Sequence, residues 1–542
     1  MKKLLASFLA LTLLVGLTGT VLAADPLGKY DPPITVKYAR GASLDPKFKD
    51  DQSYENNIWI TEYQDVLGIN VNTVWTAEGV EAYNQKLQLS ILSQDIPDIF
   101  VCNPSQFQML VEAGMLEDLT NVLPEYQSEL VAENLAADNY VGLNQATVGG
   151  KLYGLPQNSV GNGKMMFTFI REDWRVALGL DEPKTLDDLV AMAKAFTEND
   201  PDGNGVADTY GFGISNEPFE TYFSVPGFFN SFGAFPNQWI LKDGKVEFGS
   251  IQPEMKSALA ALKNWYDQGL IDPEFIVKNS FTVSQDAIAG KVGIAVAEWW
   301  LITWPLPDGF KLGEYWKAYP ILFDASAPEQ RVGAVAKLEN RHVVRKGYEH
   351  PEALVKMYNL FQERVMSQKY DTTVYKTDGT YDFQGLAAVY TVIGHDRNMR
   401  NHLVVTEALD KRDSALLDEG NADQIDLYKN AGNYIDGVDL GVDQNAHNWS
   451  ATRAFIGPDS VYGRLKYYAD NDMFKVDPFY GSDTPAMTDY AAQLKSDTIE
   501  LILDIITGAR PLDAFDEFVE HWKSLGGDDM TAQVNEWYEA QQ

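Results

Sequence analysis

The sequence predicts an α/β fold of more than one domain. Apolar segments of strand length alternate with amphipathic segments of helical length along the chain, an order typical of a mostly parallel sheet built of βαβ units. The length of 542 residues exceeds what one hydrophobic core usually supports, so at least two domains are expected. No linker rich in proline or serine separates them, which indicates short connecting segments.

A first set of alternating elements occupies the N-terminal part of the chain. The spacing of apolar residues, two for strands and 3.6 for helices, defines each element. The expected elements are strands at 34–38, 69–74 and 98–102 and helices at 54–67 and 80–92. Gly68, directly after the first helix, is a typical stop signal.

A second set begins after Pro156. Strands are expected at 165–170, 210–214 and 288–296. Thr185 and Asp188 have the spacing of a capping box at the start of a helix, and Gly269 ends a strongly amphipathic one. Four apolar residues at helical spacing predict a last helix that ends at 526–527: Leu512, Phe515, Val519 and Trp522.

Residues 1–24 have the organisation of a signal peptide. Lys2 and Lys3 precede an apolar run at 4–17, and small residues follow, so cleavage is expected near Ala23 or Ala24. The run is too short to cross a bilayer, which takes about twenty apolar residues. No cysteine follows it, so lipid attachment is not expected. The sequence therefore predicts a periplasmic or secreted protein.

The charge balance narrows the range of partners. Asp and Glu number 78 against 43 Lys and Arg, a formal net charge of -35. Such a surface repels nucleic-acid backbones and anionic lipid headgroups, so neither is an expected partner. An anionic ligand would need a local basic cleft. Five arginines are candidates for one: Arg341, Arg345, Arg397, Arg400 and Arg453.

The segment at 200–208 resembles the first part of an EF-hand calcium loop. Oxygen-bearing residues alternate at positions 1, 3, 5 and 9, and Gly205 allows the sharp turn. The expected ligands of a structural Ca²⁺ ion are Asp200, Asp202, Asn204, Asp208 and the Val206 carbonyl. Gly211 stands where the loop's bidentate glutamate would be, so the ligand set is incomplete. The alternative is a solvated turn held by Asx hydrogen bonds.

Aromatic residues make up 12% of the chain and supply candidate binding platforms. Trp299, Trp300 and Trp304 follow an apolar strand, and α/β sheets bind ligands beyond the carboxyl ends of their strands. Further candidates are Tyr222, Trp239 and Trp449. The alternative for each of these side chains is core packing.

Several short motifs together resemble the family 1 extracellular solute-binding proteins of bacterial ABC importers. They are, in order, Tyr153–Pro156, Ile170–Trp174, Thr185–Leu189, the 200–208 loop with Tyr210–Gly213, Ala289–Ala295 and Ile506–Gly508. The length and the loop are most similar to the branch that includes alginate-oligosaccharide binders. In that branch the residue after the last aspartate can be a glutamate ligand of calcium, whereas this chain has Thr209.

The resemblance implies a two-lobe fold with a ligand cleft between the lobes. Crossing segments would lie near 157–165, 284–290 and 377–383. The implied division is 25–157 with 290–378 for lobe 1, 158–289 with 379–500 for lobe 2, and 501–542 for C-terminal helices. Asn158, in the first crossing, joins the expected ligand-binding residues.

The resemblance also implies a function. The lobes of such a receptor close on an oligosaccharide and deliver it to a membrane permease, without catalysis. We expect a monomer. Two alternatives stay open at this point: an exported enzyme acting on polysaccharide, which would need two carboxylates at the cleft, and an oligopeptide-binding receptor.

Overall fold

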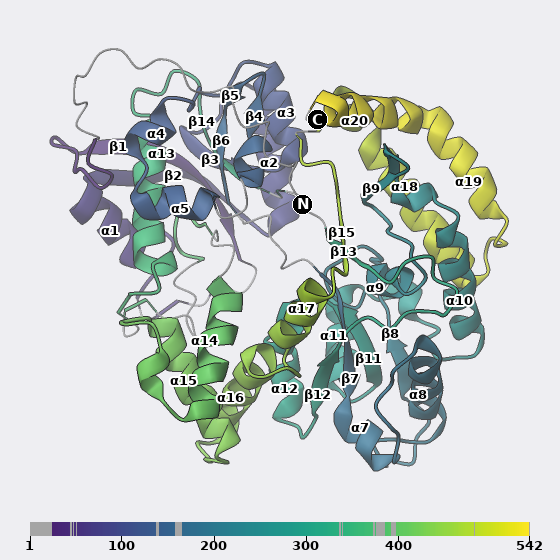
Figure 1. Cartoon of the computed structure of the whole chain (residues 1–542). Helices are drawn as coiled ribbons and strands as arrows, with labels where there is room; N and C mark the ends of the chain where they lie inside the picture. The colour runs from purple at the N-terminus through teal and green to yellow at the C-terminus, as the bar shows by residue number, and fades with distance from the viewer. Residues whose placement is uncertain are drawn as a thin grey trace, which may run out of the picture.

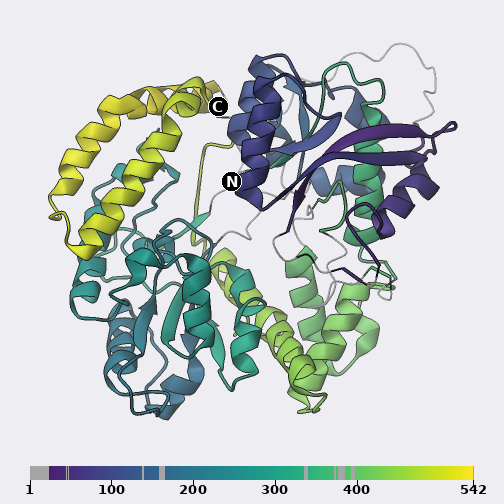
Figure 2. The ribbon, with the colours of Figure 1, turned by 180° about the vertical axis from the view of Figure 1, so that it is seen from behind.

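The computed structural model describes residues 24–43, 46, 48–49, 51–136, 140–157, 165–334, 338, 340–371, 374–375, 385–391, 397–481 and 483–540. The predicted signal peptide up to residue 23 and Asn158 lie outside these ranges. In the described ranges we find no helix both long and apolar enough to cross a membrane. Two α/β lobes face each other, with helices α18–α20 along the second lobe and helices α14–α17 running from beneath the first lobe to the side of the second (Figures 1 and 2).

The first lobe is built on a five-stranded sheet. Its order is β2 (Ile69–Glu78), β1 (Ile34–Ala42), β3 (Ile99–Cys102), β14 (Arg341–Val344) and β6 (Gly154–Pro156). The β2–β1–β3 pairs are parallel, while β14 is antiparallel to both of its neighbours. The helices of this lobe are α1 (Ile58–Leu67), α2 (Val80–Leu92), α3 (Pro104–Glu112), α4 (Val122–Tyr126), α5 (Glu129–Ala136), α6 (Val141–Asn144) and α13 (Glu352–Phe361).

The second lobe is built on a four-stranded sheet. Its order is β12 (Trp316–Tyr319), β7 (Phe167–Arg171), β11 (Val292–Ala297) and β8 (Tyr210–Gly213). Among its neighbouring strands β11 and β8 form a parallel pair, while β7 is antiparallel to both β12 and β11. Its helices are α7 (Glu172–Ala177), α8 (Leu186–Glu198), α9 (Pro226–Asn230), α10 (Glu254–Asp267), α11 (Ser280–Ile288), α12 (Leu306–Phe310), α18 (Pro485–Thr507), α19 (Ala514–Trp522) and α20 (Asp528–Ala540).

The described residues also form three two-stranded ribbons. They are β4 (Thr147–Val148) with β5 (Lys151–Leu152), β9 (Trp239–Lys242) with β10 (Lys245–Phe248), and β13 (Val332–Ala334) with β15 (Phe474–Val476). The β13–β15 pair is parallel and ties the chain segment that approaches β14 to a strand far along the sequence.

The helices α14 (Arg397–Lys411), α15 (Ala422–Ile435), α16 (Val442–Phe455) and α17 (Val461–Asp470) contact both lobes. Toward the first lobe, the Gln368 amide donates to the Asp423 carboxylate of α15 at 3.0 Å. Toward the second, Trp449 of α16 stacks on Phe310, with ring centroids 4.9 Å apart. These helices therefore link the two lobes on one side of the molecule.

Local signals in the sequence correspond closely to helix ends. Gly68 adopts the left-handed conformation (φ 67°) and ends α1, as predicted. Thr185 and Asp188 form the predicted capping box of α8. The expected end at 526–527 is a bend instead of a terminus, because Gly526 (φ 122°) turns the chain and α20 follows.

The chain passes between the two lobes at positions that differ from the predicted lobe boundaries. Residues 290–378, expected in the first lobe, include β11 and β12, which pair with β7 in the second sheet. Residues 386–389, expected in the second lobe, are buried in the core of the first. An apolar strand buried on both faces carries no sequence signal of which sheet it joins, since its partners are remote in the chain.

Candidate functional site

The carboxyl ends of the parallel strands of the first lobe open on a cavity of about 390 Å³, here called the first cavity. Residues 40–43 at the end of β1, Gly79 and Val80 after β2, and Cys102 and Asn103 at the end of β3 line it. This is the edge at which α/β sheets bind ligands. Its size is within the usual range of small-ligand sites.

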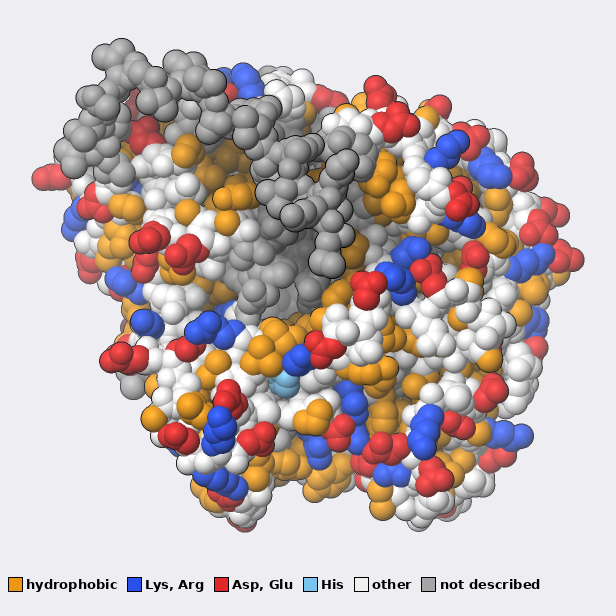
Figure 3. Space-filling view, in the orientation of Figure 1, with side chains coloured by type: hydrophobic (Ala, Val, Ile, Leu, Met, Phe, Trp, Pro, Cys, Tyr) orange, Lys and Arg blue, Asp and Glu red, His pale blue; other side chains and the backbone are white. Residues whose placement is uncertain are grey.

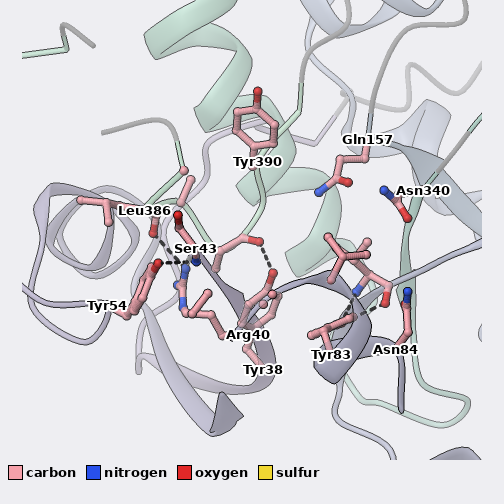
Figure 4. Close-up of a pocket in the computed structure, with 18 of the residues that line it drawn as sticks. Tyr38, Arg40, Ser43, Tyr54, Tyr83, Asn84, Gln157, Asn340, Leu386 and Tyr390 are labelled. Carbon is pink, nitrogen blue, oxygen red and sulfur yellow. Dashed lines mark hydrogen bonds between the residues drawn. The ribbon is translucent and has the colours of Figure 1, made fainter. Parts of the chain in front are cut away.

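Tyrosines and amides dominate this cavity. Its wall includes Tyr38, Tyr54, Tyr83 and Tyr390 together with Asn84, Asn103, Gln157 and Asn340. Figure 4 shows Tyr390, Gln157 and Asn340 on one side and Tyr38, Tyr83 and Asn84 on the other. Rings offer apolar faces, and amides both donate and accept hydrogen bonds. Such a wall suits a ligand with apolar ring faces and many hydroxyl groups.

Hydrogen bonds hold the tyrosine rings in place. The Tyr83 hydroxyl donates to the Val101 carbonyl at 2.9 Å and accepts from its N–H at 3.2 Å. The Tyr54 hydroxyl accepts from the N–H of Ser43 at 2.9 Å. Tyr38 donates to the Ala388 carbonyl, and burial raises the pKa of its hydroxyl. The wall is therefore arranged before any ligand binds, which lowers the entropic cost of binding.

A second cavity, of about 620 Å³, lies between the lobes. The first lobe contributes the start of α3 at 103–105, and the second contributes residues around 219–239, Glu298 and the 477–498 segment. Asn103 lines both cavities. Its side chain caps α3 by accepting from the N–H of Gln106 at 2.9 Å. Asn103 is therefore part of the wall of both cavities where the first lobe faces the second.

Three of the predicted aromatics cluster at the carboxyl end of β11. The Tyr222 ring lies 5.1 Å from Trp300 and 5.8 Å from Trp304. The Trp300 indole N–H donates to Glu298 at 3.1 Å, and Glu298 lines the second cavity. Trp304 is 44% exposed. The structure therefore brings these three rings together beside Glu298, a residue that lines the cavity between the lobes.

The remaining predicted aromatics lie elsewhere. Trp299 packs edge-to-face on Tyr462, with centroids 5.5 Å apart, and so joins α17 to the second lobe. Trp239 lines the second cavity although it is mostly buried. Trp449 is 0% exposed and belongs to the core. We leave Trp449 out of the candidate site because no part of its ring reaches solvent or a cavity.

The predicted calcium loop is held by its own side chains. Both Asp200 carboxylate oxygens accept backbone N–H groups, from Asn204 at 3.1 Å and Gly205 at 3.0 Å. The Asn204 amide donates to Asp202 at 2.8 Å and Asp208 at 3.2 Å. Burial and the neighbouring carboxylates Asp200 and Asp208 raise the pKa of Asp202. Three carboxylates thus repel one another around one amide.

The loop's geometry fits a cation only in part. Among the described residues no group of three or more His, Cys, Asp or Glu is arranged to hold a metal ion. Thr209 points away, because its hydroxyl donates to the Phe196 carbonyl at 2.8 Å. The charge of the carboxylates and the raised Asp202 pKa nevertheless favour a cation among them.

Most of the arginines proposed for a basic cleft are paired elsewhere. Arg345 donates to Asp98 at 2.8 Å, Arg397 to Asp423 at 2.8 Å and Arg400 to Asp418 at 2.7 Å. Across the visible face, basic and acidic side chains intermingle (Figure 3). The arginine that lines the first cavity is Arg40, which sequence reasoning missed. Its position just past the strand expected at 34–38 could have indicated a ligand-binding residue, because α/β sheets bind ligands beyond the carboxyl ends of their strands.

His342 of β14 contacts the backbone of Tyr390, a residue that lines the first cavity. It is fully buried, its Nε2 donates to the Tyr390 carbonyl at 2.7 Å, and burial lowers its pKa to about 4. The unfolded chain, with an ordinary pKa of 6.5, binds this proton more tightly. Stability from neutral His342 is therefore complete above pH 6.5 and is lost as the pH falls toward 4.

We expect the variant His342→Gln, which retains an N–H donor, to lose less stability than the wild type as the pH falls below 6.5. Denaturant unfolding of both proteins between pH 7 and about 4.5 measures it. Equal slopes in the two proteins would show that His342 does not titrate on unfolding.

Two α/β lobes with a cavity at their facing edges define a ligand-binding protein of the two-lobe type. The chain belongs to the bacterial extracellular solute-binding protein family, whose profile matches residues 45–354. This match covers more than half of the chain.

Curated relatives match parts of the chain. The lipoprotein LipO of Bacillus subtilis is 29% identical over 304 residues, 54% of this chain and 56% of the relative. The fructooligosaccharide ABC transporter substrate-binding protein FusA of Streptococcus pneumoniae is 30% identical over 209 residues, 35% of this chain and 38% of FusA. The matched region thus spans about half or less of the length of these relatives.

Solved structures match nearly the whole fold. Alginate-binding protein AlgQ2 without calcium ion superposes with a TM-score of 0.64, at 17% identity, over 95% of this chain and 100% of that one. FusA in complex with kestose gives 0.63, at 16% identity, over 94% and 99%. The predicted two-lobe α/β fold is therefore confirmed.

Proposed function

We propose that this protein captures an oligosaccharide between its lobes for an ABC importer. The main support for this proposal is the first cavity, where four tyrosines and four amide side chains converge at the strand ends. Named relatives support the ligand class, since they bind fructooligosaccharide or polygalacturonan and rhamnogalacturonan. Asn103 of the first lobe lines both cavities, which supports a binding site that continues toward the second lobe.

Capture works by closure of the lobes. A ligand that contacts both lobes only when they are closed shifts the population toward the closed form. The closed monomer then docks on a membrane permease and releases the sugar chemically unchanged.

A thermal-shift screen of neutral and acidic oligosaccharides tests this proposal. At least one sugar should raise the melting temperature, by an amount that grows with its concentration, and mass spectrometry should recover it intact. Recovery of shortened sugar would favour the alternative of a polysaccharide-acting enzyme. Stabilisation by peptides alone would favour an oligopeptide receptor.

We propose in addition that the 200–208 loop binds a structural Ca²⁺ ion. The carboxylates of Asp200, Asp202 and Asp208 with the Asn204 amide and the Val206 carbonyl would hold it. A bound ion would replace carboxylate repulsion with attraction and fix the loop before β8. Solved relatives described as an alginate-binding protein without calcium and a FusA EF-hand mutant support this assignment.

Removing calcium should therefore lower thermal stability, and adding it back should restore stability. At a calcium concentration about 100 times Kd the gain is about 2.7 kcal/mol. The matched variant Asp202→Asn should lose most of this response, while Asp187→Asn on the exposed side of α8 should keep it. A melting temperature that ignores chelator would identify the loop as a plain Asx turn.

We propose export with cleavage near Ala23 or Ala24. Intact-mass measurement of protein from the exporting host should then give a chain that starts at Ala24 or Asp25. A mass that includes residues 1–23, or an added lipid, would contradict this assignment.

A further inference from the structure

We propose that helices α14–α17 close on the ligand as part of the second lobe and turn on the first lobe at a polar cluster around Asp423. This inference rests on the proposed function and assigns the body that moves when the lobes close. In Figures 1 and 2 the four helices run from beneath the first lobe to the side of the second. They contact the two lobes in different ways, and this difference indicates which lobe they follow.

Apolar packing fixes α16 and α17 on the second lobe. Trp449 of α16 and Tyr462 and Tyr468 of α17 belong to the buried core of that lobe. Tyr468 stacks on Phe167 of β7, with ring centroids 5.4 Å apart, and its hydroxyl accepts from the N–H of Ile321 at 2.7 Å. A close-packed core resists sliding, because each shift opens a void or forces an overlap. We therefore expect α16 and α17 to move with the second lobe as one body.

α14 and α15 are held on α16 and α17 in turn. They pack on each other through a small buried core, which consists of Val405, Leu409, Leu427 and Ala431. Phe455 of α16 packs against this core. The Asn398 amide of α14 donates to the Tyr462 hydroxyl at 2.8 Å, and His402 Nδ1 donates to the Phe455 carbonyl at 2.5 Å. The four helices thus form one unit that is attached to the second lobe.

The first lobe contacts these helices through polar groups. None of the described residues of α14–α17 belongs to the apolar core of the first lobe. Instead, Gln368 and Tyr370 of the first lobe donate hydrogen bonds to the Asp423 carboxylate of α15, the Gln368 amide at 3.0 Å. Arg397 of α14 donates to the same carboxylate through Nε at 2.8 Å. The Gln368 side-chain oxygen accepts from Asn421 at 3.0 Å. These five residues are here called the Asp423 cluster.

The Asp423 cluster lies close to a place where the chain crosses between the lobes. Residues 386–389 are buried in the first lobe, and Arg397 already begins α14. Another crossing lies between Ala334, in the core of the second lobe, and Leu338, whose N–H donates to Gln145 of the first lobe at 2.7 Å. Points beside a covalent crossing move least when two lobes rotate, so hydrogen bonds there can persist through the motion. The position of the cluster is therefore that of a pivot.

A firm pivot restricts the lobes to one rotation. Without it, the open protein would also populate arrangements that cannot close directly, and the apparent affinity falls with the fraction of protein that can close. Asp423→Asn removes the charge that pairs with Arg397 and should weaken sugar binding about fivefold, although Asp423 lines neither cavity. Tyr370→Phe removes one hydrogen bond and keeps the ring packed on the first lobe, so it should have a smaller effect in the same direction.

Double electron–electron resonance between spin labels tests which parts move together. Pairs of labels on Leu89→Cys, Val176→Cys and Ile435→Cys report on the first lobe, the second lobe and the helices, and these three side chains are exposed. Cys102, the one native cysteine, is buried and should not take up label. At saturating sugar the 176–435 distance should stay the same, while the 89–176 and 89–435 distances change. A change in the 176–435 distance would overturn the assignment of the helices to the second lobe.

Asp418→Asn is the matched control for the pivot. It removes an arginine-paired charge from the same helices, but its partners Arg400 and Gln424 both lie within them. In the protein without sugar, Asp423→Asn should broaden the distribution of the 89–435 distance, and Asp418→Asn should leave it unchanged. Wild-type affinity and distributions in both Asp423→Asn and Tyr370→Phe would overturn the pivot while leaving sugar binding intact. Binding of no sugar at all would overturn the proposed function, and the sugar-free distributions would still decide whether the pivot exists.

Discussion

Replacing Trp300 with alanine should weaken sugar binding about fivefold or more, because it removes a hydrogen bond to Glu298, which lines the cavity between the lobes, and such a bond contributes about 1 kcal/mol. The Trp300 ring lies 5.1 Å from Tyr222 and 5.9 Å from Trp304, and its indole N–H donates to Glu298, which lines the cavity between the lobes. The ring is only partly buried. We therefore expect the unfolding free energy to fall by about 1 kcal/mol or less.

Titration with the sugar found by the screen measures the sugar affinity, and denaturant unfolding without sugar measures the free energy of unfolding. Trp300→Phe is the matched variant, since it keeps a ring against Tyr222 but cannot donate to Glu298. It should lose less affinity than the alanine variant. Unchanged affinity in Trp300→Ala would remove this cluster from the binding site.

Replacing Trp449 with alanine should have the opposite effect: a large loss of stability and little change in sugar affinity. Its ring is fully buried and stacked on Phe310, so truncation leaves a large cavity between α16 and the second lobe. Losses of about 3–5 kcal/mol accompany such core truncations. The sugar affinity of the protein that remains folded should change little, because Trp449 reaches neither cavity.

Trp449→Phe provides the control for this prediction. The indole N–H of Trp449 has no hydrogen-bond partner in the described protein, so phenylalanine removes no hydrogen bond and keeps most of the stacking. Denaturant unfolding should place this variant much closer to the wild type than to Trp449→Ala. A loss below about 1 kcal/mol in the alanine variant would show that the core tolerates this cavity.

The comparison of Trp300 and Trp449 shows what sequence could and could not predict. Both tryptophans are candidate binding platforms in the sequence. The residues around each of them do not distinguish an exposed aromatic side chain from a buried one. Trp300 lies beside Glu298 because β11 ends there, which the sequence pattern indicated. Trp449 is buried because α16 packs on α12, a contact between remote segments that no local pattern contains.

The distinction between local sequence signals and contacts of remote segments also explains which parts of the fold and of the first cavity could be predicted. Gly68 and the Thr185 capping box act within one turn of helix, so their roles follow from the residues themselves. The wall around Arg40 combines the end of β1 with Asn340 and the 385–390 segment. These parts meet only through the sheet order β1–β3–β14 and the packing of residues 386–389 in the core, neither of which spacing reveals.

The central claim is that two lobes close on a sugar and release it unchanged. Small-angle X-ray scattering of the mature protein, with and without the sugar found by the screen, tests it most directly. We expect a smaller radius of gyration at saturating sugar, with the sugar recovered intact afterwards. A radius that does not change while the sugar is bound would contradict it.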